Sequence, residues 1–423
     1  MQSHNQVAAQ PRAQRVNRAL AVFIFFGIGY FLSNFFRAAN AVIAGDLVRD
    51  LGLSAADLGM MTSLFYAGFA AAQLPLGVAL DRIGPRVAVP ALMLATVVGC
   101  LLFATASALP QVAAGRMLIG IGMAGNLMGA VKAFAVWFPP HRVATFTSLM
   151  VGIGALGALA AATPLAWLNQ QFGWRTVFVG GAVAALASAA GIAAGTRNAP
   201  DGVAWRAPSG APDEGFARIF LSVQFWRIAP LNFFLIGTLL AVQTLWAGPY
   251  LFDALRLPPI DVGNLLLIIS AGVAAGYGLC GWLADRFGAQ RVLAVGTPLF
   301  LLSLAPLVLP DPASPVLLAG TFFVFGFTGA FNLLTLAQVR PLFPPHMAGR
   351  AVTAVNLFGF GGAAIIQWGM GTIISAFAPD PAGRYPVAAY VAAFGTAMAL
   401  TAIALAWYLA PVRIRETPAQ RYG

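Results

Sequence analysis

The chain has 423 residues, of which 60% are hydrophobic and only 9% are charged, and its mean hydropathy is +0.82. A soluble domain of this size carries about 25% charged residues, so too few polar side chains are present to cover a surface in water. Most of the chain must therefore lie in lipid. Its apolar runs are continuous and do not alternate, which argues against a β-barrel and indicates spanning helices.

The formal net charge of +11 would point to nucleic acid if the protein were soluble. Here most basic residues fall in loops on one side of the predicted spans, so membrane topology explains them and no nucleic-acid partner is expected. The two cysteines, Cys100 and Cys280, lie inside apolar runs and are interpreted as packing residues. The polar start of the chain leads into a long apolar run without a cleavage pattern, so no cleaved signal peptide is expected.

Twelve apolar runs long enough to cross a bilayer follow one another along the chain. The first six lie at 19–44, 57–80, 88–109, 113–138, 145–168 and 175–195. The second six lie at 229–252, 263–283, 291–309, 315–338, 351–376 and 386–409. The sequence therefore predicts an all-α membrane protein with twelve transmembrane helices in two pseudo-symmetric six-helix bundles, 19–195 and 229–409.

The segment between the bundles, 196–228, holds the most polar interior stretch and is predicted to be a cytoplasmic linker. Its last part, 216–228, interleaves arginines with aromatic residues, which fits either a short helix on the membrane surface or an early start of the seventh span. With a cytoplasmic N-terminus, 17 of the 24 basic residues fall on that side, four lie outside and three lie within spans. Both termini are therefore predicted to be cytoplasmic, as tails at 1–18 and 410–423.

The two halves of the chain carry the same motifs in the same order. A loop motif, an Asn-Leu pair and a Phe-Pro-Pro-His turn recur with offsets of 204, 206 and 205 residues. They begin at Gly77, Asn126 and Phe138 in the first half and at Gly281, Asn332 and Phe343 in the second. The chain is therefore interpreted as a duplicated six-helix unit, an architecture typical of carriers that work by alternating access.

The loop after the second span reads Gly-x-x-x-Asp-Arg-x-Gly-x-Arg, and the eighth span is followed by the same pattern with its last arginine one position late. Its residues are Gly77, Asp81, Arg82, Gly84 and Arg86, then Gly281, Asp285, Arg286, Gly288 and Arg291. Arg116, Gly120 and Gly122 of the fourth span match a second motif. Over essentially the whole chain, these patterns resemble the major facilitator superfamily.

The resemblance implies a central cavity lined by spans 1, 4, 7 and 10, and loop-motif contacts that latch one access state on the cytoplasmic side. On physical grounds, Gly77 and Gly281 are expected to permit the close approach of a neighbouring helix, and Gly84 and Gly288 a tight turn. Asp81 can pair with arginines or face the positive end of another helix. The alternative interpretation of the motif is a solvated turn between two spans.

Charges at membrane depth bear most directly on function, because each costs roughly 2.5–3.5 kcal/mol on insertion scales. All thirteen acidic residues fall in loops, at span ends or in the loop motifs, whereas Arg37, Arg116 and Lys132 lie within spans. Lys132, the only lysine, shares a helix face with small residues and is expected either to face the transport pathway or to reach the cytoplasmic interface. For Arg116 a cavity-facing role and a structural role are both open.

Arg37 shares a polar face of the first span with Tyr30 and Asn34, so this face is expected to line the cavity. An arginine in this span resembles that of organic-anion carriers in the superfamily. Carriers related to sugar-acid transport often place an Asp just before it, where this chain has Phe36. The resemblance therefore does not extend to proton coupling through such a carboxylate. The alternative role for Arg37 is a structural tie to backbone carbonyls.

Neutral polar groups mark the corresponding spans of the second half. Gln243, Trp246 and Tyr250 share a face of the seventh span, and Asn332 lies on a polar stripe of the tenth, at the position that matches Asn126 in the fourth. Such stripes serve interhelical hydrogen bonds as readily as substrate contact, while the two aromatic rings offer a surface for an apolar part of a substrate. The candidate substrate-binding set is Arg37, Lys132, Tyr30, Asn34, Asn126, Gln243, Trp246, Tyr250 and Asn332.

A cavity that holds cations and no carboxylate attracts anions. The leading hypothesis is a secondary active transporter that moves a small organic anion, such as a carboxylate, across a bacterial inner membrane by alternating access. It is expected to act in lipid as a monomer, without cofactor or bound metal, and protons are an open choice as coupling ion.

The first alternative is a proton-coupled exporter of drugs or metabolites in the same superfamily. The Gly-Pro motif often present in span five of such exporters is absent, since the span offers Gly152, Gly154 and Gly157 instead. A membrane enzyme or sensor is the third hypothesis. It is disfavoured because no metal-ligand cluster, phosphate loop, nucleophile–base set or large soluble domain is visible in the sequence.

Overall fold

The computed structural model describes residues 12–200, 217–309 and 314–410, and within them every regular element is a helix. The first half contains α1 Arg12–Ala38, α2 Asn40–Leu51, α3 Ala55–Arg82, α4 Pro85–Ala104, α5 Leu109–Met123, α6 Gly125–Trp137, α7 Pro140–Ala160 and α8 Thr163–Gly195. The second half contains α9 Ala217–Phe220, α10 Val223–Ala241, the π-helical turn η1 Val242–Trp246, α11 Ala247–Asp253, α12 Pro259–Phe287, α13 Ala289–Ser303, α14 Pro315–Gly329, the 3-10 turn η3 Ala330–Asn332, α15 Leu333–Val339, α16 Pro345–Ser375 and α17 Val387–Leu409. Short 3-10 turns, Ala305–Leu307 and Arg340–Leu342, complete the described elements.

Most of the predicted tails, and 201–216 of the predicted linker, lie outside the described residues. Ten helices or joined helices are long and apolar enough to cross a membrane, and the bent pair Ala55–Gln73 with Pro75–Arg82 makes eleven. The described residues thus carry ten to eleven candidate membrane helices, where the sequence predicted twelve. The difference falls on the predicted fifth span, in which the apolar helix covers only Thr145–Ala160. In the second half, α10 already begins at Val223.

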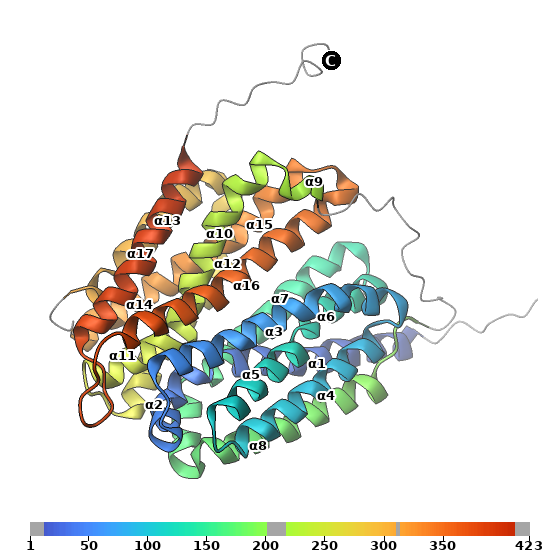
Figure 1. The fold of residues 1–423 in the computed structure, drawn as a ribbon. Helices are drawn as coiled ribbons and strands as arrows, with labels where there is room; N and C mark the ends of the chain where they lie inside the picture. Colours follow the sequence, from blue (N-terminus) through green and yellow to red (C-terminus); the bar gives the residue numbers. More distant parts are fainter. Residues whose placement is uncertain (1–11, 201–216, 310–313, 411–423) are drawn as a thin grey trace, which may run out of the picture.

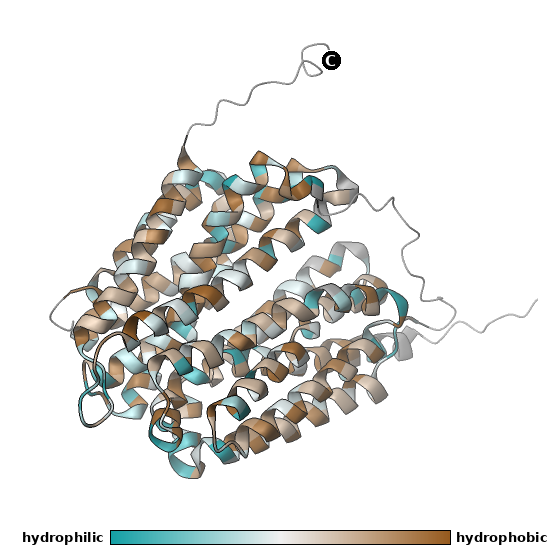
Figure 2. Ribbon diagram, in the orientation of Figure 1, coloured by the Kyte–Doolittle hydropathy of each residue, from teal (hydrophilic) through white to brown (hydrophobic). Residues whose placement is uncertain are grey.

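The helices form two bundles that lie side by side, and Figure 1 shows them in contact around α2 and α11 and farther apart where α4 and α10 begin. Figure 2 shows apolar residues along most of each helix, with hydrophilic residues mainly at helix ends and in connecting loops. We call the end at which α1 begins and α17 ends the terminal face, and the other end the opposite face.

Local sequence signals set many of the helix starts. Proline is the first residue of α4, α7, α12, α14 and α16, where its fixed φ suits the helix and its missing N–H costs no hydrogen bond. The repeated Phe-Pro-Pro-His motif is explained in this way, since its second proline opens both α7 and α16. At the start of α3, Ser54 and Asp57 cap each other's backbone N–H groups in a capping box.

The predicted spans 1, 4, 7 and 10 are each interrupted within the bundle. The first breaks between α1 and α2 at Ala39, and the fourth between α5 and α6 at Ala124. The seventh passes through the π-helical turn η1, and the tenth through the 3-10 turn η3. Because lipid provides no hydrogen bonds, backbone groups freed by such breaks must find partners inside the protein.

Side chains supply hydrogen-bond donors at these breaks. Arg116 Nη1 donates to the Phe36 carbonyl oxygen at 2.8 Å, near the break in span one. Asn126 Nδ2 donates to the carbonyl of the residue three positions earlier, at 3.3 Å, and Asn332 Nδ2 does the same at 2.8 Å. The repeated asparagines therefore hold equivalent breaks in the fourth and tenth spans.

A second pair of equivalent contacts ties the first span of each bundle to its last. Asp50, near the end of α2, accepts a hydrogen bond from Trp174 Nε1 at 2.9 Å, and Asp253, at the end of α11, accepts one from Tyr390 Oη at 2.5 Å. The indole hydrogen bond, helped by Arg175, holds the pKa of the Asp50 carboxyl below its usual range. This carboxylate therefore stays ionised and keeps its tie at neutral pH.

The motif glycines divide into two groups. Gly84 and Gly288 have φ of 79° and 86° where α4 and α13 begin, so the predicted tight turns are confirmed. The predicted close approach at Gly77 and Gly281 is not found, because a Cβ at either position would meet no atom within 4 Å. Close approach occurs instead at Gly120, where a Cβ would overlap the Phe65 carbonyl oxygen of α3.

The two bundles are joined near the opposite face by hydrogen bonds between neutral groups. The backbone N–H groups of Ala55 and Ala56, in the first turn of α3, donate to Tyr385 Oη at 3.2 Å and Ser375 Oγ at 2.6 Å. Thr163 Oγ1 and Asn264 Oδ1 make a third link at 2.8 Å. The second bundle therefore caps a helix N-terminus of the first, which closes this face.

Replacing Gly120 by alanine should destabilise the protein by about 1–3 kcal/mol, the usual cost of overpacking, because α3 and α5 must move apart. A lower melting temperature in detergent, followed by tryptophan fluorescence, measures the effect. Gly77→Ala is the matched control, since its Cβ has open space. Equal melting temperatures for the two variants would contradict the packing described.

Removing the Ser375 hydroxyl should loosen the closed face, since Ser375→Ala leaves a helix N–H unpaired at a cost of about 1 kcal/mol. The measurement is the rate of maleimide labelling of Leu58→Cys, a buried residue near this face, in a background whose native cysteines are both buried. We expect faster labelling. Thr372→Ala, which removes a hydroxyl bonded only within its own helix, should leave the rate unchanged.

Candidate functional site

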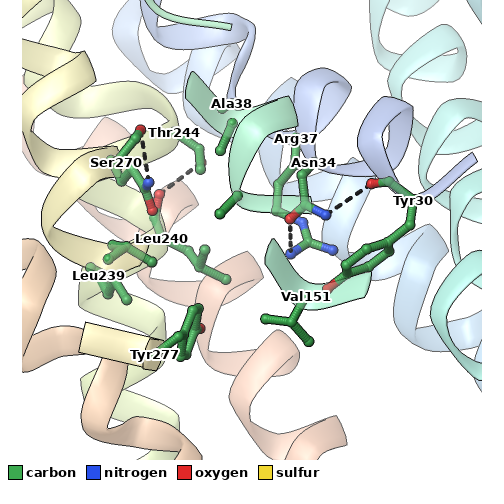
Figure 3. A pocket seen from close by; sticks show the side chains of 14 residues that line it. Tyr30, Asn34, Arg37, Ala38, Val151, Leu239, Leu240, Thr244, Ser270 and Tyr277 are labelled. Carbon is green, nitrogen blue, oxygen red and sulfur yellow. Dashed lines mark hydrogen bonds between the residues drawn. The ribbon is translucent and has the colours of Figure 1, made fainter. Parts of the chain in front are cut away.

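A cavity of about 60 Å³ lies between the two bundles, lined by α1 and α7 from the first and by α10, η1 and α12 from the second (Figure 3). Since a water needs about 10–15 Å³ of such space, the cavity holds a few waters in this conformation. An organic solute would fit only after the bundles move apart. Fourteen residues line it, and Arg37 is the only charged one among them.

Arg37 projects from the last turn of α1 and makes only neutral contacts among the described residues. Its Nη1 donates to Asn34 Oδ1 at 3.4 Å, and Asn34 Nδ2 in turn donates to the Tyr30 carbonyl oxygen at 3.0 Å. The guanidinium lies 5.3 Å from the ring centre of Phe69 on α3 and 5.5 Å from that of Phe360 on α16. Its Nε is buried without a hydrogen-bond partner.

These contacts place a positive charge at the junction of the bundles. The two aromatic rings come from opposite bundles and lie 4.7 Å apart, so each can offer its face to the cation. Rings and one amide oxygen compensate a partly buried charge only in part. Arg37 therefore retains the capacity to bind an anion, and Tyr30, Asn34 and Arg37 lie together in the cavity as the sequence predicted.

Across the cavity, the second bundle presents neutral polar groups. Gln243 Nε2 donates to Ser270 Oγ at 3.2 Å. Thr244 Oγ1 lies 2.9 Å from Tyr66 Oη of the first bundle and donates to the Leu240 carbonyl oxygen at 2.7 Å. Gln243 and Thr244 both belong to the π-helical turn, a widened turn that often occurs at functional sites.

The other two interior cations lie elsewhere. Lys132 was predicted to face the pathway or reach the interface, and the structure shows its ammonium paired with Asp81 of the loop motif. The two side chains are 34% and 38% exposed, so the pair is partly hydrated. Arg116 is fully buried in the first bundle, over the Phe65 ring and bonded to the Phe36 carbonyl. Neither lines the central cavity.

Four neutral residues of the predicted set also lie outside the cavity. Asn126 and Asn332 are buried at the helix breaks. Trp246 donates from Nε1 to the Gln367 carbonyl at 3.0 Å and lines a separate cavity of about 700 Å³ near the opposite face. Tyr250 packs edge-on against Tyr390 and Phe394.

The sequence analysis missed Thr244, Ser270 and Tyr277, which line the cavity beside Gln243. A signal was present for the last two, which are seven residues apart and therefore on one face of α12.

Known proteins resemble this chain in sequence along most of its length. A gentisate transporter of Corynebacterium glutamicum is 26% identical over 388 residues, 88% of this chain and 82% of the relative. A D-galactonate transporter of Escherichia coli is 24% identical over 94% of this chain and 97% of its own length. A chloramphenicol resistance protein of Streptomyces lividans is 28% identical over 74% of this chain and 80% of the relative.

Solved structures share the fold at low sequence identity. The nucleoside transporter NupG superposes with a TM-score of 0.74 at 13% identity, covering 93% of this chain and 100% of its own. A D-xylose-proton symporter also gives 0.74, at 14% identity over 93% and 98%. The sequence profile of the Major Facilitator Superfamily matches residues 26–367 and, in a second overlapping match, 231–421. With its duplicated helical bundles and this match across the chain, the protein belongs to the major facilitator superfamily and is a membrane transporter, not an enzyme.

Proposed function

We propose that this transporter carries a small organic anion with a single carboxylate, and that Arg37 binds the carboxylate. The observation that carries the proposal is the guanidinium in the central cavity, which has neutral contacts only and a buried Nε without a partner. A bidentate arginine–carboxylate contact would satisfy it. The relatives named for gentisate and D-galactonate transport, and another named a putative tartrate transporter of Agrobacterium vitis, support an anionic cargo.

The neutral groups opposite Arg37 define the rest of the cargo. Gln243, Ser270 and Thr244 present amide and hydroxyl groups suited to hydroxyl substituents. Tyr30 and Tyr277 offer rings against its carbon skeleton. A second carboxylate would enter a cavity with no further charged lining residue, so a hydroxylated monocarboxylate fits this lining better than a dicarboxylate.

We place this activity in a bacterial inner membrane, with the terminal face in the cytoplasm because the basic loops lie on that side. Counting Thr145–Ala160 as a span gives twelve, in bundles 19–195 and 229–409 joined by the linker 196–228. The ion pair of Lys132 with Asp81 then belongs to the cytoplasmic loop motif, so we assign Lys132 to the gate and not to the anion site. We expect the protein to act as a monomer.

Arg37→Gln should abolish the thermal stabilisation given by the best-bound carboxylate, since loss of a charged hydrogen bond of about 1.5–3 kcal/mol weakens binding about tenfold to a hundredfold. Lys132→Gln should retain it, because Lys132 is paired with Asp81 outside the cavity. Thermal-shift titration of the purified protein with gentisate and D-galactonate makes the comparison. If Lys132→Gln loses binding as fully as Arg37→Gln, the single-cation site is wrong.

Monoanions should bind better than dianions of the same skeleton. D-galactonate and galactarate differ by one carboxylate, and burying the second without a partner cation should weaken binding at least about tenfold. Competition between the two acids for the purified transporter measures the ratio. Equal affinities would contradict the assignment of one carboxylate.

The chloramphenicol resistance relative supports a second candidate, export of a neutral drug. Uptake of labelled chloramphenicol and of labelled gentisate into the same proteoliposomes separates the two. Transport of chloramphenicol that is unchanged by Arg37→Gln, with no transport of gentisate, would favour the exporter.

A further inference from the structure

The net charge inside the cavity depends on whether an anionic cargo is bound. Among the described lining residues, no negatively charged side chain neutralises the cavity when the cargo is absent. Arg37 is the only charged lining residue. Its contacts are the Asn34 amide oxygen and the faces of Phe69 and Phe360, all of them neutral. The cavity of an empty carrier is therefore positive, and that of a carrier loaded with a monoanion is neutral.

The groups that face Arg37 cannot change this. They include the hydroxyl groups of Tyr30 on α1 and Tyr277 on α12, and of Tyr66 on α3, which is hydrogen-bonded to the lining residue Thr244. None of them is a carboxylate. The lining residues from α7 and α10 are apolar, and those from η1 are neutral. Arg116 on α5 adds positive charge nearby. Unlike lysine, an arginine does not release its proton in a protein.

We infer, on the basis of the proposed function, that this protein is an anion exchanger, which returns across the membrane only with a second anion bound. In each crossing there is a state in which both faces are closed and bulk water does not reach the cavity, whose volume is already only about 60 Å³ in the conformation described here. A closed cavity strips water from an unpaired guanidinium, which is strongly unfavourable, whereas a guanidinium–carboxylate pair is neutral and internally hydrogen-bonded. The loaded carrier therefore reorients readily and the empty carrier does not.

The first test compares two preparations of the wild-type transporter in liposomes. Labelled gentisate or D-galactonate, whichever stabilises the protein more, is supplied outside, and the liposomes contain either the same unlabelled acid or buffer alone. We expect uptake about tenfold or more faster into the preloaded liposomes. An imposed proton gradient should not replace the internal acid.

Two substitutions should convert exchange into net transport by different routes. Asn34→Asp places a carboxylate where the Asn34 oxygen now lies, 3.4 Å from Arg37 Nη1, so the empty cavity acquires an internal counter-charge. Asn34→Ser is the neutral control, since it also loses the amide contact to the Tyr30 carbonyl. Arg37→Lys allows the cation to lose its proton on burial, so net uptake should rise with pH.

The outcomes separate this inference from the proposed function. Equal uptake into preloaded and empty liposomes by the wild type overturns the exchanger but leaves the anion carrier intact. The ratio of uptake into preloaded liposomes to uptake into empty ones should fall in Asn34→Asp. If Asn34→Asp still transports and this ratio is unchanged, the lack of a negative charge beside Arg37 is not what prevents return of the empty carrier. If no anion is taken up in either arrangement, the proposed function fails and the exchanger fails with it. If both substitutions inactivate the protein, the comparison of preloaded and empty liposomes with the wild-type protein still tests whether it is an exchanger.

Discussion

A polar group in the hydrocarbon region of a bilayer must find its partner inside the protein, and this requirement links the broken helices to the candidate site. Arg116 and Arg37 show two ways of meeting it. Arg116 is sealed within the first bundle, where a backbone carbonyl left by the break in span one accepts its hydrogen bond. Arg37 lies at the junction of the bundles, where it contacts an amide oxygen and two rings. Its Nε has no hydrogen-bond acceptor in the protein, and a bound solute can provide one.

The two halves of the chain share the residues that stabilise turns, helix breaks and contacts between helices, but they differ in the residues that line the cavity. Positive-φ glycines, asparagines at helix breaks and aspartate ties recur in both halves. The polar groups that line the cavity differ, with Tyr30, Asn34 and Arg37 from the first half and Gln243, Thr244, Ser270 and Tyr277 from the second. The first bundle therefore contributes the charge, and the second contributes neutral polar groups, so the two bundles present different chemistry to the cavity.

Much of this organisation could be predicted from the sequence because it depends on local properties. Hydropathy and the repeat gave the helical bundles, and helical periodicity placed Tyr30, Asn34 and Arg37 on one face. Lys132 was harder, because its partner Asp81 lies 51 residues away and helix periodicity says nothing about such pairs. Asn126 and Asn332 were predicted to bind substrate. Their amides instead donate to backbone carbonyls at helix breaks, and a hydropathy pattern does not show where a helix is interrupted. The predicted count of twelve spans exceeds the ten to eleven candidates among the described residues, where the apolar helix of the fifth predicted span, Thr145–Ala160, is short.

The contacts that close the opposite face join main-chain amides and uncharged side chains. Hydrogen bonds of this kind carry no net charge, so dissolved salt screens them little. Two of the donors are backbone groups of alanines, and the bond does not depend on which side chain occupies those positions. These contacts should therefore depend little on the ionic strength of the medium, unlike the partly exposed ion pair of Lys132 with Asp81.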